Sequence, residues 1–165
     1  LRTLFQLVRA DFYNPLCQFI VRATNPPLRP LRRMLPGFHG VDTGSVVLMF
    51  ILKLVELFLI AALASRSGSF VGFAVLSIAE LLDLLVNVFL FAILIQVIVS
   101  WINPGAHNPI IALLHTLTEP LLRPARRLIG TASGLDFSPI VVMVVLVICQ
   151  KLIIARLFGV GVQLL

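Results

Sequence analysis

Charged residues are scarce in this 165-residue chain, which has 12% of them against 59% hydrophobic residues. A soluble domain has about twice that charged share, because its surface faces water. Apolar runs of about 20 residues, the length that crosses a bilayer, occupy residues 44–64 and 137–158. The composition therefore excludes a soluble globular domain and predicts an integral membrane protein.

The chain also lacks the common catalytic and metal-binding patterns. Cys17 and Cys149 have no histidine or second thiol at metal-ligand spacing, and we expect both to be small buried apolar residues. No Gly-rich phosphate loop, HExxH motif or nucleophile elbow occurs. His39, His107 and His115 do not recur between the repeats described below, and His115 is expected to be a packed side chain. We predict a non-enzymatic protein without a cofactor or metal.

An internal repeat is the most informative feature of the sequence. Residues 14–42 align without a gap on residues 108–136, at a constant offset of 94. Chance does not give such a run of proline, arginine and glycine identities. The matched pairs are Asn14/Asn108, Pro15/Pro109, Thr24/Thr118, Pro26/Pro120, Leu28/Leu122, Arg29/Arg123, Pro30/Pro124, Arg32/Arg126, Arg33/Arg127, Gly40/Gly134 and Asp42/Asp136.

The repeat predicts an all-α membrane protein of two tandem parallel units, each a transmembrane helix, a basic connector and a second transmembrane helix. Unit one is 1–65, with connector 14–42 and span 44–64, and unit two is 70–165, with a span within 70–102, connector 103–136 and span 137–158. Residues 69–101 are too many for one simple span and too few for two, so we expect one span that extends beyond the far membrane surface. About four spans result, and the first is expected to be incomplete because its counterpart reaches further upstream than Leu1.

Each connector is expected to form two short helical pieces joined by a bend. Asn14-Pro15 and Asn108-Pro109 place an N-cap residue before a proline at the first helical position. Second starts are expected at Asn25-Pro26 and Glu119-Pro120, where Pro30 and Pro124 would kink an established helix. The alternative is that the second helix begins at Pro30 and Pro124.

Arginines gather in the connectors, whereas the turn at residues 65–69 holds only Arg66. The positive-inside rule then places both connectors in the cytoplasm and the termini outside. Residues 15–24 are apolar but too few to cross a bilayer. This favours a segment that lies in the membrane interface, and an ordinary positive-inside loop is the alternative. The repeated arginines, our candidates for contacts with anionic lipid or a partner, are Arg29, Arg32, Arg33, Arg123, Arg126 and Arg127.

Asp42 and Asp136 stand where the next span begins. We hypothesise that each pairs with an arginine of its own connector, Arg32 or Arg33 in the first and Arg126 or Arg127 in the second, and so locks the bend. Simple N-capping of the following helix is the alternative.

Lys53, Glu56 and Lys151 lie inside spans, where each charge costs about 2.5–3.5 kcal/mol on insertion scales. The offset places Lys151 level with Leu57, so Glu56 and Lys151 are expected to pair, and Lys53 can join them. A buried ion pair that fixes helix order and a cation or proton path are the two readings. Glu80 and Asp83 are expected to be solvated at the outer surface.

Two motifs carry a resemblance: Asp11-Phe-Tyr-Asn-Pro-Leu and the doubled motif that starts at Ala23 and Thr118. By these motifs the chain resembles the YggT family of bacterial membrane proteins, which includes the YlmG proteins of plastids and Gram-positive bacteria. Pro27 replaces the leucine that is usual at its position in the family. It implies a small inner-membrane protein tied to cell division or nucleoid distribution, to osmotic-stress tolerance with altered cation uptake or, in one plastid branch, to attachment of haem to a cytochrome. It implies no catalytic residue.

Two functional hypotheses follow. The first is a scaffold or assembly factor of the inner membrane, whose connector arginines engage anionic headgroups or an acidic protein partner. The second is an oligomeric ion transporter or channel that uses Lys53, Glu56 and Lys151. Nucleic acid is not expected as a direct ligand, because the net charge of +6 sits where membrane topology already requires it.

Overall fold

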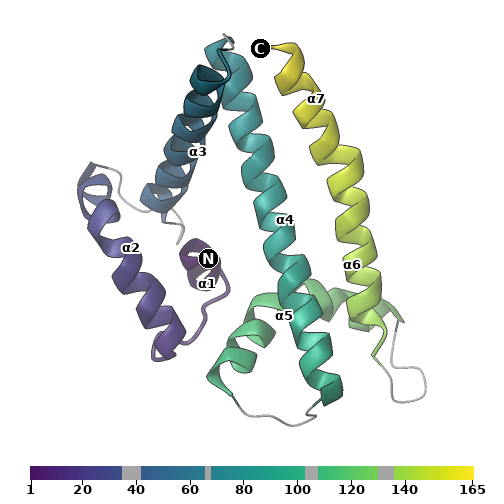
Figure 1. The fold of residues 1–165 in the computed structure, drawn as a ribbon. Coiled ribbons are helices and arrows are strands. Elements are labelled where there is room, and N and C mark those ends of the chain that lie inside the picture. The colour runs from purple at the N-terminus through teal and green to yellow at the C-terminus, as the bar shows by residue number, and fades with distance from the viewer. Residues whose placement is uncertain (35–41, 66–67, 103–107, 130–135) are drawn as a thin grey trace.

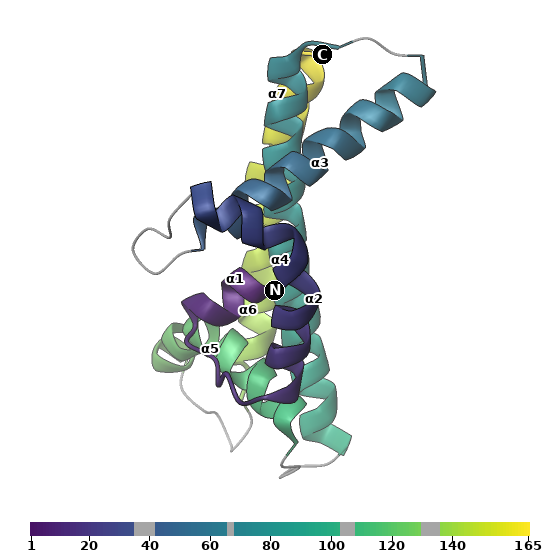
Figure 2. The same ribbon diagram turned by 90° about the vertical axis from the view of Figure 1, so that its left-hand side faces the viewer.

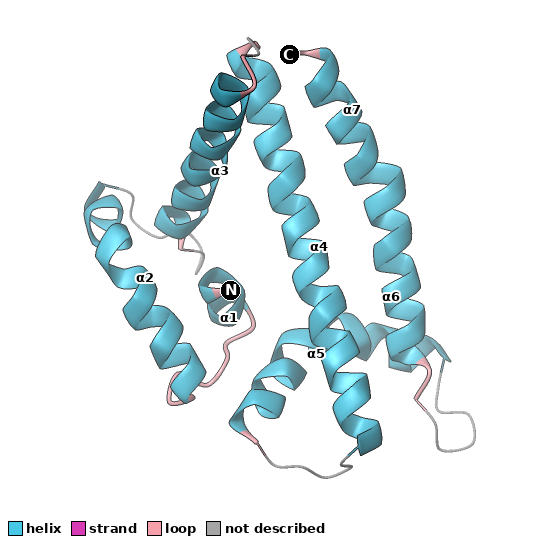
Figure 3. Ribbon diagram, viewed as in Figure 1, coloured by secondary structure: helices cyan, strands magenta, loops and turns pink. Residues whose placement is uncertain are grey.

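The computed structural model describes residues 1–34, 42–65, 68–102, 108–129 and 136–165. All regular structure in these ranges is helical, which confirms the all-α prediction (Figure 3). The helices are α1 (Arg2–Leu7), α2 (Pro15–Met34), α3 (Thr43–Leu63), α4 (Phe70–Ile102), α5 (Pro109–Ile129), α6 (Ser138–Cys149), the π-helix η1 (Gln150–Ile154) and α7 (Ala155–Gln163). Of the residues singled out above, those outside the described ranges are His39, Gly40, Arg66, His107 and Gly134.

Three helices in the described residues are long and apolar enough to cross a bilayer: α3, α4 and the continuous run Ser138–Gln163 that joins α6, η1 and α7. Upstream of α2, the described residues 1–14 contain α1, whose six residues are too few to cross. The count of four spans therefore stays a prediction.

Helix α4 is a single element of 33 residues, as expected. Its first turns meet the C-terminus: the Ser69 hydroxyl donates to the Leu164 carbonyl, and a Cβ added at Gly72 would lie 2.9 Å from the Leu164 backbone. Figure 1 shows this end level with the end of α3, while the other end of α4 passes below α5. Glu80 and Asp83 are therefore well inside the bundle.

The connectors form single helices, which corrects the prediction of two pieces. The predicted starts are right, because Asn14 Oδ1 accepts from the Leu16 amide at 3.0 Å and Asn108 Oδ1 accepts from the Ile110 amide at 2.9 Å. The predicted second starts at Pro26 and Pro120 do not occur.

The connector helices continue through their inner prolines because each proline removes only one hydrogen bond of the helix, while apolar packing continues past it. Leu28 and Leu122, two residues beyond those prolines, are both buried. The ribbons of α2 and α5 curve instead of ending there (Figures 1 and 2).

The two halves of the chain pack in a similar order. Helix α4 contacts α5 and α6, and a core of Ile93, Leu122 and Val142 joins these three helices. In the first half, α1 contacts α2 and α3. This similarity supports the tandem-repeat organisation, which stays a prediction. Figure 1 shows that α3 begins higher in the bundle than α6, although both spans end at the same level.

Candidate functional site

An ion pair joins the first connector to the span that follows it. The Arg32 Nε donates to Asp42 Oδ1 at 3.3 Å, and its Nη2 donates to the other carboxylate oxygen. Asp42 is 5% exposed and also caps α3, since the Ser45 amide and hydroxyl donate to it at 3.3 and 2.6 Å. The pairing and the N-capping that were stated as alternatives therefore both occur.

Arg2 adds a second cation to this cluster, and no sequence pattern predicted it. Its Nε lies 3.8 Å from Asp42 Oδ2. Its Nη1 donates to Thr24 Oγ1 at 2.9 Å and to Asn25 Oδ1 at 2.8 Å, so one side chain links α1, α2 and the start of α3. We call Arg2, Arg32, Asp42 and Ser45 the first clamp.

The second connector repeats the ion pair with a different set of neighbours. Arg126 Nε donates to Asp136 Oδ2 at 2.8 Å, and its Nη1 donates to Glu119 Oε2 at 2.9 Å. The Ser138 amide donates to Asp136 at 2.9 Å near the start of α6. The side chain of Asp136 is 32% exposed. We call Arg126, Asp136, Glu119 and Ser138 the second clamp.

Both aspartates are stabilised as carboxylates. Burial alone would raise the pKa of Asp42, but hydrogen bonds from Arg32 and Ser45 outweigh burial and hold the pKa below its ordinary value. The same balance, with Arg126 and Ser138 as donors, lowers the pKa of Asp136. The hydrogen bond to Asp136 is the largest cause of the raised pKa of Arg126. Both clamps are therefore ionic at neutral pH.

The remaining connector arginines are unpaired in the described part of the chain. Arg29 and Arg33 on α2, and Arg123 and Arg127 on α5, are exposed and make no ion pair with a described residue. Each couple is four residues apart, so its two guanidinium groups lie on the same side of the helix. In both connectors one repeated arginine is used to fix the fold and two repeated arginines are left available for a ligand. Arg22 of the first connector, which has no counterpart in the second, is also exposed.

The span charges pair differently from the prediction. Lys53 Nζ lies 3.0 Å from Glu56, as expected for helix neighbours, and 2.7 Å from Glu80 on α4. Glu80 is thus an ion-pair partner and not a solvated surface group. Lys151 makes no ion pair with any described residue, so its predicted pairing with Glu56 is wrong within the chain. The repeat offset of 94 had placed Lys151 at the depth of Leu57. This estimate of depth was wrong because α3 begins higher in the bundle than α6 (Figure 1).

Asp83 makes hydrogen bonds to one neighbouring helix and within its own helix, α4. Gln150 Nε2 donates to Asp83 Oδ1 at 2.7 Å, and Asn87 Nδ2 donates to Asp83 Oδ2 at 2.9 Å. Gln150 is the first residue of η1, a π-helical turn of the kind that often marks functional positions. Asn87 and Gln150 were not predicted from the sequence, although the four-residue spacing of Asp83 and Asn87 in an apolar helix indicates such a contact.

A third polar group joins α4 to α5. Thr118 Oγ1 donates to Gln96 Oε1 at 2.6 Å, and Gln96 Nε2 lies 2.9 Å from His115 Nδ1. His115 is therefore exposed and hydrogen-bonded and not a packed apolar neighbour. Gln96, a lone polar residue in an apolar run, was not singled out from the sequence.

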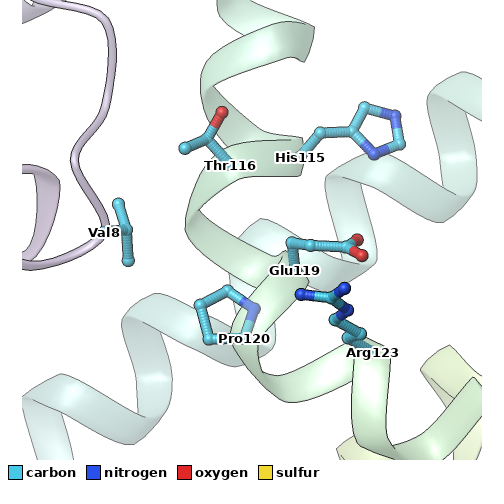
Figure 4. A pocket seen from close by; sticks show the side chains of 6 residues that line it. All are labelled: Val8, His115, Thr116, Glu119, Pro120 and Arg123. Atoms are coloured by element: carbon cyan, nitrogen blue, oxygen red, sulfur yellow. The ribbon is translucent and has the colours of Figure 1, made fainter.

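Figure 4 shows a pocket beside this group, of about 610 Å³. His115, Glu119 and Arg123, from successive turns of α5, line it together with Val8. Glu119 is already held by Arg126. Among the described residues, no group of three His, Cys, Asp or Glu side chains is arranged to hold a metal ion.

In its described residues the structure has three apolar helices long enough to span a membrane, and basic amphipathic helices connect them. This arrangement defines a helical membrane protein. The chain belongs to the CCB3/YggT family, whose model matches residues 1–63 and 75–157.

The curated relatives cover most of the chain. An uncharacterised protein of Pseudomonas aeruginosa is 46% identical over 159 residues, 95% of this chain and 81% of the relative. A protein of Vibrio alginolyticus is 40% identical over 147 residues, 87% of this chain and 78% of the relative. The uncharacterised protein YggT of Escherichia coli K12 is 36% identical over 149 residues, 88% of this chain and 76% of the relative. No solved structure matches the chain.

Proposed function

We propose that this chain is a non-enzymatic scaffold of the bacterial inner membrane, whose two connector helices bind anionic lipid headgroups on the cytoplasmic side. The proposal rests on the different contacts that the connector arginines make. Arg32 and Arg126 are used in the clamps, while Arg29, Arg33, Arg123 and Arg127 are exposed and unpaired in the described chain.

The geometry of the free arginines suits phosphate. Two guanidinium groups four residues apart can donate to one phosphate, or to two neighbouring headgroups, and arginine binds phosphate through paired hydrogen bonds. The buried Leu28 and Leu122 hold each helix against the bundle, so the arginines sit on positioned backbones. Each basic residue near an anionic membrane surface contributes about 1 kcal/mol.

The polar groups inside the bundle support a structural role over a catalytic one. Asp83, Gln96 and Thr118 each make a hydrogen bond to another helix, so these groups fix the order and register of the helices. The family resemblance adds a link to cell division, envelope organisation or osmotic-stress tolerance, and the experiment below includes those phenotypes as readouts.

The proposal is tested by replacing the four free arginines with glutamine in the full-length protein. Native mass spectrometry from lipid discs that contain phosphatidylglycerol should show retained anionic lipid on the wild type and a loss of most of it on the variant. The matched control carries lysine at the same four positions, keeps the charge and should retain most of the lipid. Complementation of a deletion strain under osmotic and division stress should follow the same order. Equal lipid retention by wild type and glutamine variant would overturn the proposal.

An ion transporter or channel is the second candidate, favoured by one observation. Polar groups occur at three depths of α4, at Glu80, Asp83 and Gln96, and each is bonded to a different neighbouring helix. This candidate predicts cation flux in liposomes that is abolished by Glu56→Gln and is indifferent to the four glutamine substitutions. The scaffold predicts the reverse sensitivity.

A further inference from the structure

Charged side chains on the outside of the spans are the feature that the scaffold proposal does not use. Exposed apolar side chains in a span need no explanation, because lipid covers them. A charge facing the hydrocarbon layer is different, because it costs several kcal/mol unless it is paired or reaches the surface. Two such places occur on opposite sides of α4.

The first place is an acidic cluster between α3 and α4. Lys53 is bound to Glu56 at 3.0 Å and to Glu80 at 2.7 Å, so one cation faces two carboxylates and the cluster has a net charge of −1. Glu56 is 52% exposed. Figure 2 shows α3 leaning away from α4 and α7, which leaves this side of the molecule open.

The second place is Arg156 on α7, which the sequence analysis did not single out. Its depth follows from the close contact of α4 and α7, in which a Cβ added at Gly161 would lie 2.7 Å from the Leu76 side chain. The two helices are antiparallel and share one rise per residue, so Arg156, five residues before Gly161, is level with Leu81. Arg156 therefore lies at the depth of the bond between Glu80 and Lys53.

Arg156 also faces away from the rest of its own chain. Ile154 and Gly161 are buried on the side of α7 that meets α4. At 100° per residue, Arg156 lies about 160° around the helix from Ile154. Arg156 is exposed and makes no ion pair or hydrogen bond with a described residue.

We propose that these two places bind each other between copies of the chain: Arg156 of one copy pairs with the Glu56 and Glu80 cluster of the next. The charges are complementary, because the cluster has a net charge of −1 and Arg156 supplies +1. Copies related by rotation about the membrane normal keep every residue at its own depth, so a pair between copies requires groups of similar depth.

The depths of these groups satisfy that requirement. Glu80 and Arg156 are level within about 2 Å, and Glu56 is one helical turn from Lys53, or about 5 Å, which the two long side chains span. Helices α3 and α7, which carry Glu56 and Arg156, lie on opposite sides of α4 (Figure 1), so the contact is head-to-tail. Such a contact gives a ring where the rotation between copies closes.

Lys151 provides the matched control. The same register places it level with Val86, about 7 Å nearer the connector end than Arg156. Its flexible side chain reaches towards the headgroups on that side, as lysines near span ends do. Lys151 is exposed like Arg156, and Lys151→Glu makes the same change in charge five residues away.

The test is charge reversal in the full-length protein, with subunit number counted by native mass spectrometry in lipid discs. Glu56→Lys and Arg156→Glu should each reduce the oligomer at least tenfold, because each variant places like charges across every contact. Co-expression of the two variants should restore it, since each contact in an alternating ring again joins opposite charges. The chain that carries both reversals should assemble by itself, and Lys151→Glu should assemble like the wild type.

Three results would overturn this inference. The first is a wild type that runs as a monomer or with a different protein bound in fixed ratio, which would assign these charges to another partner. The second is failure of the two single variants, each extracted and folded, to assemble when mixed. The third is disruption of assembly by Lys151→Glu as strong as that by Arg156→Glu, which would make the effect one of general charge. Lipid retention by the connectors is unaffected by the Glu56 and Arg156 substitutions, so this inference and the scaffold proposal fail separately.

Discussion

The two clamps share one arginine–aspartate pair of the repeat and balance their charges in opposite ways. In the first clamp one buried carboxylate, Asp42, lies beside two cations, Arg2 and Arg32. In the second clamp one cation, Arg126, serves two partly exposed carboxylates, Glu119 and Asp136. A motif conserved within one chain therefore does not fix the energetics of its two copies. The first clamp depends mainly on its carboxylate, Asp42, and the second on its guanidinium, Arg126.

The largest effect is expected from Asp42→Asn. The substitution removes the charge that Arg2 and Arg32 share, while the amide must still be buried at a site that is 5% exposed. We expect a loss of about 2–3 kcal/mol in unfolding free energy, measured by denaturant titration in mild detergent. Asp136→Asn is the matched substitution and should cost less than about 1 kcal/mol, because its site is solvated. Equal losses for the two would contradict the comparison.

Arg126→Gln is expected to rank second. It breaks the ion pairs with Glu119 and Asp136 together, so it should cost about 1–2 kcal/mol, reduced by solvent screening of these partly exposed groups. Glu119→Gln and Asp136→Asn each break one pair and should cost less than Arg126→Gln. A double-mutant cycle between positions 126 and 136 measures the coupling directly. A larger loss from Glu119→Gln than from Arg126→Gln would show that the cation is not the centre of this clamp.

Acid should weaken both clamps, and the first more strongly. The pKa values of Asp42 and Asp136 are lowered in the folded protein, so their contribution is present above the unfolded pKa of about 4 and is lost as the pH falls through the folded values. Thermal stability should therefore be flat from pH 5 to 8 with respect to these groups and should drop below about pH 4. The drop should be smaller in Asp42→Asn than in Asp136→Asn. A drop that is identical in both variants would assign acid sensitivity to other groups.

The smallest effect on stability is expected from the free arginines. Arg29→Gln with Arg33→Gln should change unfolding free energy by less than about 0.5 kcal/mol, because both side chains are exposed and unpaired in the described chain. The same double variant should lose anionic lipid, whereas Arg32→Gln should lose stability and keep its lipid. Calorimetry and lipid retention on the same samples separate the two. A large destabilisation by the double variant would mean that these arginines support the fold.

The sequence was sufficient wherever chemistry was local. Asn14-Pro15 starts a helix because its side-chain oxygen and fixed φ act within one turn. The Arg32–Asp42 pair could be predicted because the two residues lie in one connector, only 10 positions apart. The repeat offset of 94 then predicted the equivalent pair between Arg126 and Asp136.

The errors concern three-dimensional placement. Pro26 and Pro120 were expected to start new helices. Instead, burial of Leu28 and Leu122 keeps α2 and α5 continuous past these prolines. The pairing of Lys53 with Glu80 depends on where α3 begins relative to α4, which no periodicity reports. Arg2 was missed for a similar reason, since only the packing of α1 on α2 brings it to Asp42.

The most direct test of the scaffold proposal is the distance from arginine side chains to lipid phosphorus, measured by solid-state NMR on full-length protein with carbon-labelled guanidinium groups in phosphatidylglycerol bilayers. Phosphorus dephasing of the arginine signal should be strong in the wild type and in Arg32→Gln with Arg126→Gln, because the clamp arginines face carboxylates. It should fall to near background when Arg29, Arg33, Arg123 and Arg127 are replaced by glutamine. Dephasing that survives in that variant would contradict the assignment of the free arginines to headgroup binding.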